Sequence, residues 1–246
     1  VDAAAAIHLM PLTFKRGEVA TRRGTAFSSI DDIDIVVHGK GGHGSQPHQT
    51  VDPFNIACHL YLACQNLIAR EQDPTEQCVI SFGAINGGTA ANVIPGDVHM
   101  LGTLRTISES TRARMKERME ALCDGIAAAF GGSAEIQFLR GVPSVYNDPA
   151  LTDELIDYVE AMTGAPVSIM DKPMSGSDDM STISQAVPTT YFLLGTGTED
   201  EGVHYPVHNA RTTFDESVFA EGAALTATVA MRWLEARAHE NGEIDG

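Results

Sequence analysis

The strongest constraint on the fold is the order of strand and helix signals in the central part of the chain. Alternating Ile and Val residues over 32–39 predict a strand with one buried face. The segments that follow predict a helix, two strands, a helix and a final strand. This order is typical of a split βαβ sandwich, in which both helices cover one face of a four-stranded antiparallel sheet. The predicted strands are 32–39, 77–88, 98–107 and 134–141, and the predicted helices are 54–70 and 109–130.

End signals support both helices. Asp52 and the following Pro53 give the first helix an N-cap with proline at its first position, and Ser108 caps the second helix. Gly131 and Gly132 stop the second helix, because glycine adopts the left-handed conformation that ends many helices. Apolar side chains at helical spacing predict the buried face of this helix, namely Met115, Met119, Leu122, Ile126 and Phe130.

The segments on either side of the central stretch predict a different layer. A helix over 149–164, a hydrophobic strand over 189–195 and a long helix over 216–236 alternate as in an α/β fold. The apolar stretch 3–10 predicts another strand of the same, mostly parallel sheet. The sequence therefore predicts an α/β domain interrupted by an inserted α+β, ferredoxin-like domain of βαββαβ order. The predicted boundaries are 1–28, 29–141 and 142–246.

The stretch GKGGHGSQPH, residues 39–48, places glycines and two histidines directly after a predicted strand. Such a density of glycine indicates a tight turn or a close approach of two backbone segments. A phosphate-binding loop would require a helix to begin at once, whereas Gln46, Pro47 and His48 intervene here. The loop therefore presents His43 and His48, and their roles depend on the rest of the chain.

The composition excludes several classes of partner. The chain has 33 acidic and 16 basic residues and a formal net charge of -17, which disfavours nucleic acids and anionic membranes. No apolar run reaches the roughly 18 residues of a membrane span. The first residues lack the features of a signal peptide and begin inside an apolar element, which suggests that a segment precedes them. The four cysteines predict reduced core residues of a cytoplasmic protein, namely Cys58, Cys64, Cys78 and Cys123.

Five motifs give the chain a resemblance to a known family. They are AIHLMP, GKGGHGSQPHQTVDP, INGGTAANVIPGDV, GSDDMS and GVHYPVHNAR, in this order. In order and spacing they resemble the M20 family of metal-dependent aminoacylases and carboxypeptidases. The likeness is greatest to the amidohydrolase branch, which includes hippurate hydrolases and hydrolases of indoleacetyl amino acids. The resemblance covers nearly the whole chain, and it implies a zinc-peptidase-like catalytic domain interrupted by a lid and dimerisation domain.

The resemblance implies hydrolysis of the amide bond of N-acyl amino acids or short peptides. Members of the family use two divalent metals, which activate a water molecule that attacks the carbonyl carbon. His8 and His208 match two of the family's metal ligands, which implies two Zn2+ ions in the complete site. Mn2+, Ni2+ or Co2+ would accept the same ligand types. Without its motif, His8 would be interpreted as a histidine packed in the core.

The resemblance also implies roles for residues of the inserted domain. His43 matches a histidine that reaches the active site of a neighbouring subunit and stabilises the oxyanion there. Asn92 and Arg105 match residues that hold the carboxylate of the substrate, a task suited to the planar fork of arginine. The alternative for Arg105 is a solvated strand residue. Outside this domain, Asp178 stands where relatives usually have Glu, and it is expected to support the metal-binding wall without ligating.

The sequence departs from the family in its remaining ligands. It contains no H-A-C-G-H-D segment and no E-E pair, so a Cys, a His and a Glu ligand and the glutamate base are missing. Two histidines alone are a poor zinc site, and we expect the chain by itself to be inactive. The first interpretation is part of a metal-dependent amidohydrolase that forms a homodimer through its lid domain. The alternative is a non-catalytic fragment or pseudoenzyme that dimerises or binds a ligand.

Overall fold

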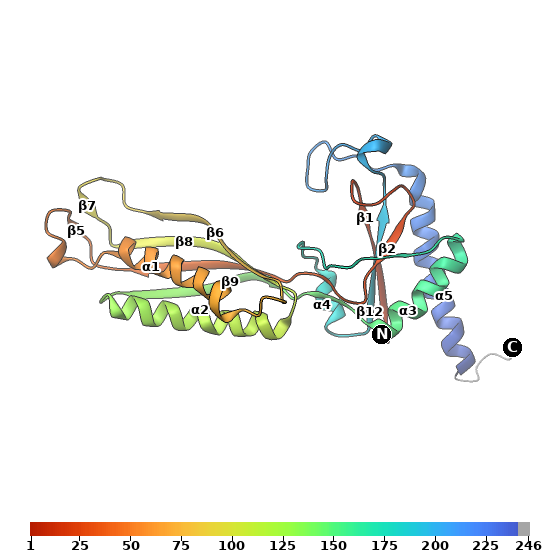
Figure 1. Ribbon diagram of the computed structural model, residues 1–246, viewed down its shortest axis with the longest axis horizontal. Coiled ribbons are helices and arrows are strands. Elements are labelled where there is room, and N and C mark those ends of the chain that lie inside the picture. Colours follow the sequence, from red (N-terminus) through yellow and green to blue (C-terminus); the bar gives the residue numbers. More distant parts are fainter. Residues whose placement is uncertain (241–246) are drawn as a thin grey trace. The chain divides into compact units, whose positions relative to one another are not determined.

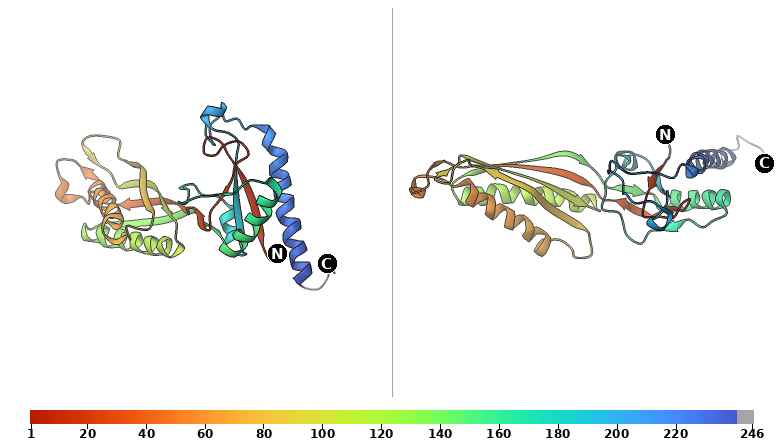
Figure 2. Two further views of the ribbon diagram at one scale, coloured as in Figure 1. Left: turned by 45° about the vertical axis from the view of Figure 1, so that its right-hand side comes forward. Right: turned by 90° about the horizontal axis from the view of Figure 1, so that it is seen from above.

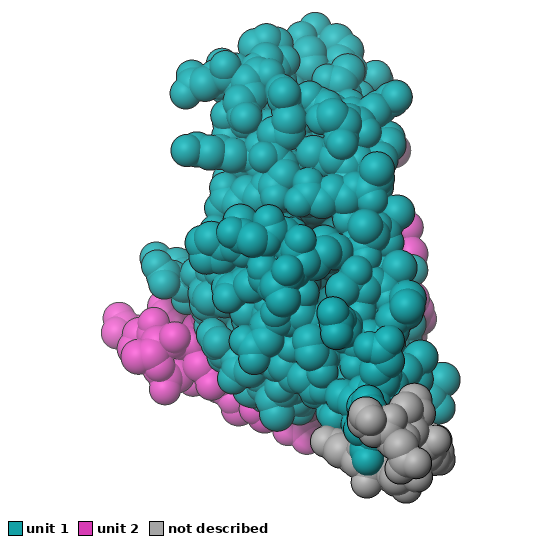
Figure 3. All heavy atoms as spheres, turned by 90° about the vertical axis from the view of Figure 1, so that its right-hand side faces the viewer, with its two compact units in different colours: residues 1–27, 145–174, 178–246 teal, residues 28–144, 175–177 magenta. Residues whose placement is uncertain are grey.

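The computed structural model describes residues 1–240, which divide into two compact units (Figure 3). The inserted unit comprises residues 28–144 and 175–177. The α/β unit comprises residues 1–27, 145–174 and those from 178 onward. Each unit has its own hydrophobic core, so the two are described separately below.

The inserted unit is an antiparallel sheet covered on one face by two helices (Figures 1 and 2). Its strands lie in the order β6-β8-β4-β9, which confirms the predicted α+β topology of βαββαβ order. A short pair, β5 and β7, extends from one end. The elements are β4 (Ile30–His38), β5 (Gly42–His43), α1 (Pro53–Asn66), β6 (Cys78–Gly87), β7 (Val93–Ile94), β8 (Asp97–Thr106), α2 (Glu109–Ala129) and β9 (Ser133–Val142).

The helix caps in the inserted unit form as the sequence predicts. The Asp52 carboxylate accepts a hydrogen bond of 2.9 Å from the Phe54 backbone N–H, and the Ser108 hydroxyl accepts one of 3.4 Å from Thr111 N–H. The first predicted helix is longer than α1, because the chain continues beyond Asn66 as a π-helical turn, Leu67–Glu71. This turn buries Leu67 in the same core as α1.

The buried face of α2 differs in part from the prediction. Met115 and Met119 are fully buried, whereas Phe130 is 41% exposed. The helix ends at Ala129, so Phe130 is the C-cap residue, and its ring stacks on the exposed His59 instead of entering the core. Cys123 and Ala127 complete the buried face. Cys58 is also exposed, contrary to the prediction that all four cysteines lie in the core.

The α/β unit contains a mixed sheet in the order β1-β12-β2-β11. The two apolar segments lie in one sheet, as predicted; β1 runs parallel to β12, and β12 runs antiparallel to β2. One face of β12 packs with α3 and α5, and the opposite face packs on a second cluster. The elements are β1 (Ala4–Met10), β2 (Val19–Thr21), β3 (Gly24–Phe27), β10 (Val145–Asn147), α3 (Pro149–Thr163), β11 (Ser168–Ile169), α4 (Met180–Ser184), β12 (Thr189–Gly195) and α5 (Phe219–Glu240).

The division between the units adds a segment that the sequence did not indicate. Ser175–Ser177 belongs with the inserted unit although the residues around it belong to the α/β unit. The buried Ser28 hydroxyl holds this segment, because it lies 2.8 Å from the Ser175 carbonyl and 3.0 Å from the Gly176 carbonyl. The other boundaries fall at 27/28 and 144/145. No helix within residues 1–240 is both long and apolar enough to cross a membrane.

Candidate functional site

His8 lies on β1, on the face of the sheet opposite to α3 and α5. Its neighbours Ile7 and Leu9 pack into the helix-covered cluster, and side chains alternate along a strand. His8 Nδ1 lies 2.8 Å from the Leu9 carbonyl oxygen. A carbonyl only accepts hydrogen bonds, so the neutral imidazole carries its proton on Nδ1 and leaves the Nε2 lone pair free. This is the protonation state that a histidine needs to bind a metal through Nε2.

Tyr191 lies beside His8 in the α/β unit, and Asp178 contacts Tyr191. The rings of His8 and Tyr191 have centroids 6.4 Å apart, and the Tyr191 hydroxyl donates a 2.9 Å hydrogen bond to Asp178 Oδ2. Burial, together with this hydrogen bond, raises the pKa of Tyr191 far above its usual value. The phenol therefore stays protonated and acts as a fixed donor. Sequence reasoning missed Tyr191. The signal that could have indicated it was a tyrosine, with its polar hydroxyl, among the apolar residues at the end of β12.

His208 lies in the loop between β12 and α5, where its side chain is exposed. Its φ of 64° is left-handed, a conformation that costs a non-glycine residue of order 1 kcal/mol or more. A turn follows directly, in which Thr212 N–H donates to the Asn209 carbonyl at 3.0 Å. Strained residues of this kind cluster at functional sites.

The metal ligands predicted from the sequence do not form a metal site by themselves. Within residues 1–240, no group of three or more His, Cys, Asp or Glu side chains is placed to hold a metal ion. His8 fits a metal ligand by its free Nε2, but a stable zinc site needs further protein ligands.

His43 and Asn92 lie together at the end of the inserted unit. β5 and β7 pair antiparallel, with His43 opposite Val93, and Gly44 N–H donates to the Asn92 carbonyl at 2.8 Å. The glycines of this loop allow the close approach, since a Cβ on Gly44 would lie 3.1 Å from the Asn92 oxygen. His43 Nδ1 accepts the Ser45 backbone N–H at 3.1 Å. Neutral His43 therefore carries its proton on Nε2 and can donate it outward.

Arg105 lies at the opposite end of β8 from this loop. It pairs with Val79, and its Nη1 donates to the Ser175 carbonyl at 3.4 Å. Asn92 lies beyond the end at which Gly87 pairs with Val98. Val98 and Arg105 are seven residues apart on the strand, about 23 Å at the usual rise of a strand. The structure thus brings His43 and Asn92 together but separates both from Arg105 of the same chain.

The comparison with protein families matches residues 25–130 to the peptidase dimerisation domain of the M20 family. Thermostable carboxypeptidase 1 of Saccharolobus solfataricus is 36% identical over 234 residues, which are 95% of this chain and 58% of that protein. N-acetyldiaminopimelate deacetylase of a Geobacillus strain is 34% identical over 221 residues, 90% of this chain and 57% of that protein. The chain thus spans a little more than half the length of these relatives.

Solved structures show the same architecture. A candidate aminohydrolase from methicillin-resistant Staphylococcus aureus has a TM-score of 0.83 at 25% identity, over 94% of this chain and 59% of that one. The Bacillus subtilis YXEP protein, described as a dinuclear metal-binding peptidase of the M20 family, has a TM-score of 0.76 at 25% identity. That match covers 96% of this chain and 58% of the other. Both matches include the α/β unit as well as the inserted unit.

Proposed function

Because this chain belongs to the M20 peptidase family, we propose that the whole protein is a metal-dependent hydrolase that cleaves the amide bond of N-acyl amino acids. The observation that carries this proposal is the 2.8 Å contact between His8 Nδ1 and the Leu9 carbonyl oxygen. This contact favours the tautomer with the proton on Nδ1, which leaves Nε2 to bind a metal. The relatives include a carboxypeptidase and a deacetylase, both of which cleave amide bonds.

This chain would supply His8 and His208 as metal ligands, and Zn2+ is the first choice of metal for these ligand types. When bound, the metal would supply a hydroxide at neutral pH by lowering the pKa of its water. The remaining ligands would come from a part of the whole protein that corresponds to the portion of the relatives this chain does not span. We place the reaction in the cytoplasm, where no disulfide is required of the four free cysteines.

His43 would stabilise the oxyanion that forms as water attacks. A neutral histidine with its proton on Nε2 is a hydrogen-bond donor, and preorganised donors of this kind typically contribute about 3 kcal/mol to the barrier. Arg105 would hold the carboxylate of the amino-acid half through its planar fork, with Asn92 as a further contact. Because His43 and Asn92 lie far from Arg105 in one chain, the proposal requires His43 and Asn92 from one subunit and Arg105 from the other.

The homodimer that this proposal requires would form through β6 and α1. β6 is an edge strand, and the surface beside it is apolar, with Leu62 64% exposed and Val79 42% exposed. The opposite edge, β9, adjoins α2, which exposes three acidic side chains. Like charges would face each other there across a two-fold axis, so β6 is the favoured edge. The exposed acidic residues of α2 include Glu117, Glu120 and Asp124.

The test is hydrolysis of N-acetyl and N-benzoyl amino acids by the whole protein supplied with Zn2+, Mn2+, Co2+ or Ni2+. We expect release of the free amino acid, its loss on chelation, its return with added metal, and no turnover by His8→Ala. Hydrolysis that survives both chelation and His8→Ala would refute the metal mechanism. Intact metal binding without hydrolysis of any N-acyl amino acid would favour the alternative of a non-catalytic binding protein.

Mixed dimers test the roles of the two subunits. A His43→Ala chain combined with a His8→Ala chain should regain activity, because one site of the pair draws an intact histidine and intact metal ligands from different chains. Arg105→Lys should weaken the binding of substrates with a free carboxylate and should affect the binding of amidated substrates much less. If subunit exchange is verified and the mixed dimer still does not regain activity, His43 does not act in the site of the neighbouring subunit.

A further inference from the structure

Tyr191 is held at every polar atom it possesses. Its backbone N–H donates to Asn147 Oδ1 at 2.8 Å, and its carbonyl accepts the Thr21 hydroxyl at 2.8 Å. Its hydroxyl donates to Asp178, and its ring meets Phe27 edge to face with centroids 5.2 Å apart. Asn147 and Thr21 are both fully buried. Tyr191 is therefore fixed both at its backbone and along its side chain.

The strand register places this fixed ring beside His8. On β12, Tyr191 pairs with Ala6, and Leu193 pairs with His8. Tyr191 is therefore the diagonal neighbour of His8 on the same face of the sheet, close enough for contact between rings. The neighbouring residue, Phe192, points to the opposite face and packs in the cluster with α3 and α5.

The other end of the Tyr191 side chain is also fixed. Asp178 accepts the Tyr191 hydroxyl through Oδ2 and the Met180 backbone N–H through Oδ1, at 2.9 Å in each case. A continuous set of contacts therefore runs from the start of α4 through Asp178 and Tyr191 to His8. Within residues 1–240, the hydrogen bond found for the His8 ring is to the next residue in the chain, so the packed Tyr191 ring is a further constraint on its rotation.

We propose that Tyr191 is a positioning residue for His8, whose ring it holds in the orientation that keeps Nδ1 on Leu9 and Nε2 free. Asp178 fixes Tyr191 and acts on His8 only through it. This inference rests on the proposed function for the role of His8 as a metal ligand. Groups that orient a metal-binding histidine typically change metal affinity by about 10- to 100-fold when they are removed.

The experiment uses the 246-residue chain labelled with 15N at histidine. Long-range 1H–15N NMR spectra, recorded without metal, report the tautomer of each ring, and the signals lost in His8→Asn assign His8. We expect the Nδ1–H tautomer in the wild type and a mixture of both tautomers in Tyr191→Leu. Tyr191→Phe and Asp178→Ala should shift the His8 signals in the same direction by a smaller amount. The two changes together should shift them no further, because both remove the same hydrogen bond.

Phe192→Leu is the matched control, since it removes the same volume from the same strand on the opposite face. A purely structural role for Tyr191 would make Phe192→Leu and Tyr191→Leu equal in their effect on His8. An equal effect, or unchanged His8 signals in Tyr191→Leu, would overturn the proposal. If Tyr191→Leu fails to fold, the comparison of Tyr191→Phe with Phe192→Leu decides by the same criteria.

A titration with Zn2+ separates this inference from the proposed function. Because this chain by itself supplies too few ligands for a stable site, we expect Zn2+ to bind weakly. It should still perturb the His8 signals, with an affinity about tenfold lower in Tyr191→Leu than in the wild type. A wild-type His8 that does not respond to Zn2+ would count against the metal role in the proposed function. The tautomer comparison would then still decide whether Tyr191 positions His8.

Discussion

The two units build their sheets from different parts of the chain. The inserted unit takes all strands of its main sheet from one continuous segment, between Ile30 and Val142. The α/β unit pairs β1, near the start of the chain, with β12, near its end. A continuous segment can close its core from its own residues, whereas a discontinuous unit must bring together segments on both sides of the insertion. We therefore expect the inserted unit to fold independently and the α/β unit to be the more easily lost.

The chain offers a separate probe for each unit. Its one tryptophan, Trp233, lies in the α/β unit, and all four cysteines lie in the inserted unit. Burial raises the pKa of Cys64 and of Cys78 from 9.0 to about 11 and that of Cys123 to about 12. In a Cys58→Ser background, thiol labelling at pH 8 should therefore report unfolding of the inserted unit alone.

The largest expected effect is from Phe192→Ala in the α/β unit. Phe192 lies on β12 and is fully buried against α3 and α5. Its truncation to alanine should lower the free energy of unfolding by about 4 kcal/mol. Urea unfolding followed by Trp233 fluorescence should move to lower denaturant, while the thiol-labelling transition stays in place. Phe219→Ala is the control, because Phe219 is exposed on α5 and should change little. Equal movement of both transitions would show that the units do not unfold separately.

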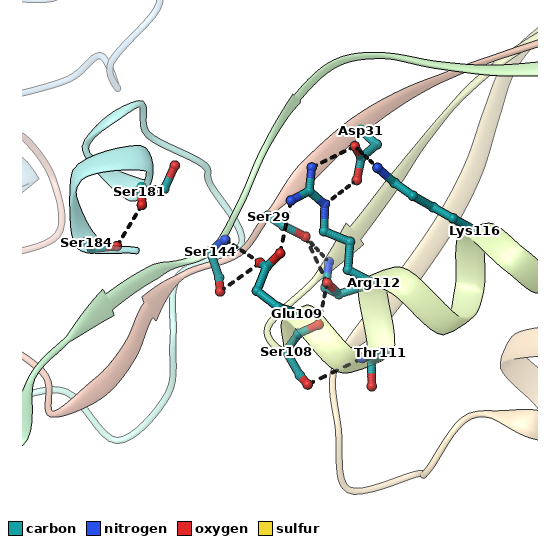
Figure 4. A network of polar contacts seen from close by, with 11 residues as sticks. Ser29, Asp31, Ser108, Glu109, Thr111, Arg112, Lys116, Ser144, Ser181 and Ser184 are labelled. Atoms are coloured by element: carbon teal, nitrogen blue, oxygen red, sulfur yellow. Dashed lines mark hydrogen bonds and ion pairs between the residues drawn. The ribbon is translucent and has the colours of Figure 1, made fainter. Parts of the chain in front are cut away.

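The next largest effect should come from a buried ion cluster in the inserted unit. Asp31 is buried and accepts two hydrogen bonds from Arg112, of 2.6 and 2.8 Å, and Lys116 lies 2.6 Å away (Figure 4). This carboxylate raises the pKa of Arg112 above its usual value. Asp31→Ala should cost about 3 kcal/mol, because it leaves the two cations without their buried partner.

Asp32→Ala is the matched control for Asp31→Ala. Asp32 is the next residue on β4 and pairs with Arg140, whose side chain is largely exposed. Exposed pairs contribute at most about 1 kcal/mol, so this change should be small. The thiol-labelling transition measures both variants. Equal effects of the two substitutions would contradict the role assigned to the buried cluster.

The helix caps give a smaller comparison between the units. Asp148 caps α3 through a 2.9 Å hydrogen bond from Leu151 N–H, whereas the Ser108 cap of α2 is 3.4 Å long. We expect Asp148→Ala to cost about 1 kcal/mol and Ser108→Ala about half as much, each on its own unit's transition. Asp148→Asn keeps the cap and should recover most of the loss. A larger effect of Ser108→Ala would reverse the assigned order.

The smallest expected effect is the pH dependence of an exposed pair. Hydrogen bonds from Arg118, of 2.7 and 2.9 Å, lower the pKa of Glu71 below its ordinary value of 4.5. A lowered carboxyl pKa gives stability that is complete above about pH 4.5 and is lost as the pH falls through the folded value. The difference in urea midpoint between wild type and Glu71→Gln should therefore be small at pH 7 and should shrink further as the pH falls below 4.5. A difference that grows on acidification would contradict this sign.

Local signals in the sequence determined the elements and their order. Asp52 and Ser108 cap the helices that the sequence assigns to them, and Gly164 ends α3 in the left-handed conformation. The βαββαβ order follows from periodicity within one continuous segment. These features depend on interactions between residues a few positions apart, which a sequence displays directly. The loop around His43 was also readable, because glycine density indicates the close approach that β5 and β7 make.

Only the tertiary structure decided which distant residues meet. The register between β1 and β12 places Tyr191 beside His8, and no local signal specifies a pairing between opposite ends of the chain. The separation of Arg105 from Asn92 follows from the length of β8, although the two residues are only thirteen positions apart in the sequence. Ser175–Ser177 joins the inserted unit through Ser28, which is distant in sequence. Each of these contacts is set by how whole faces pack together, and a side chain gives no sign of its partner until the sheet has formed.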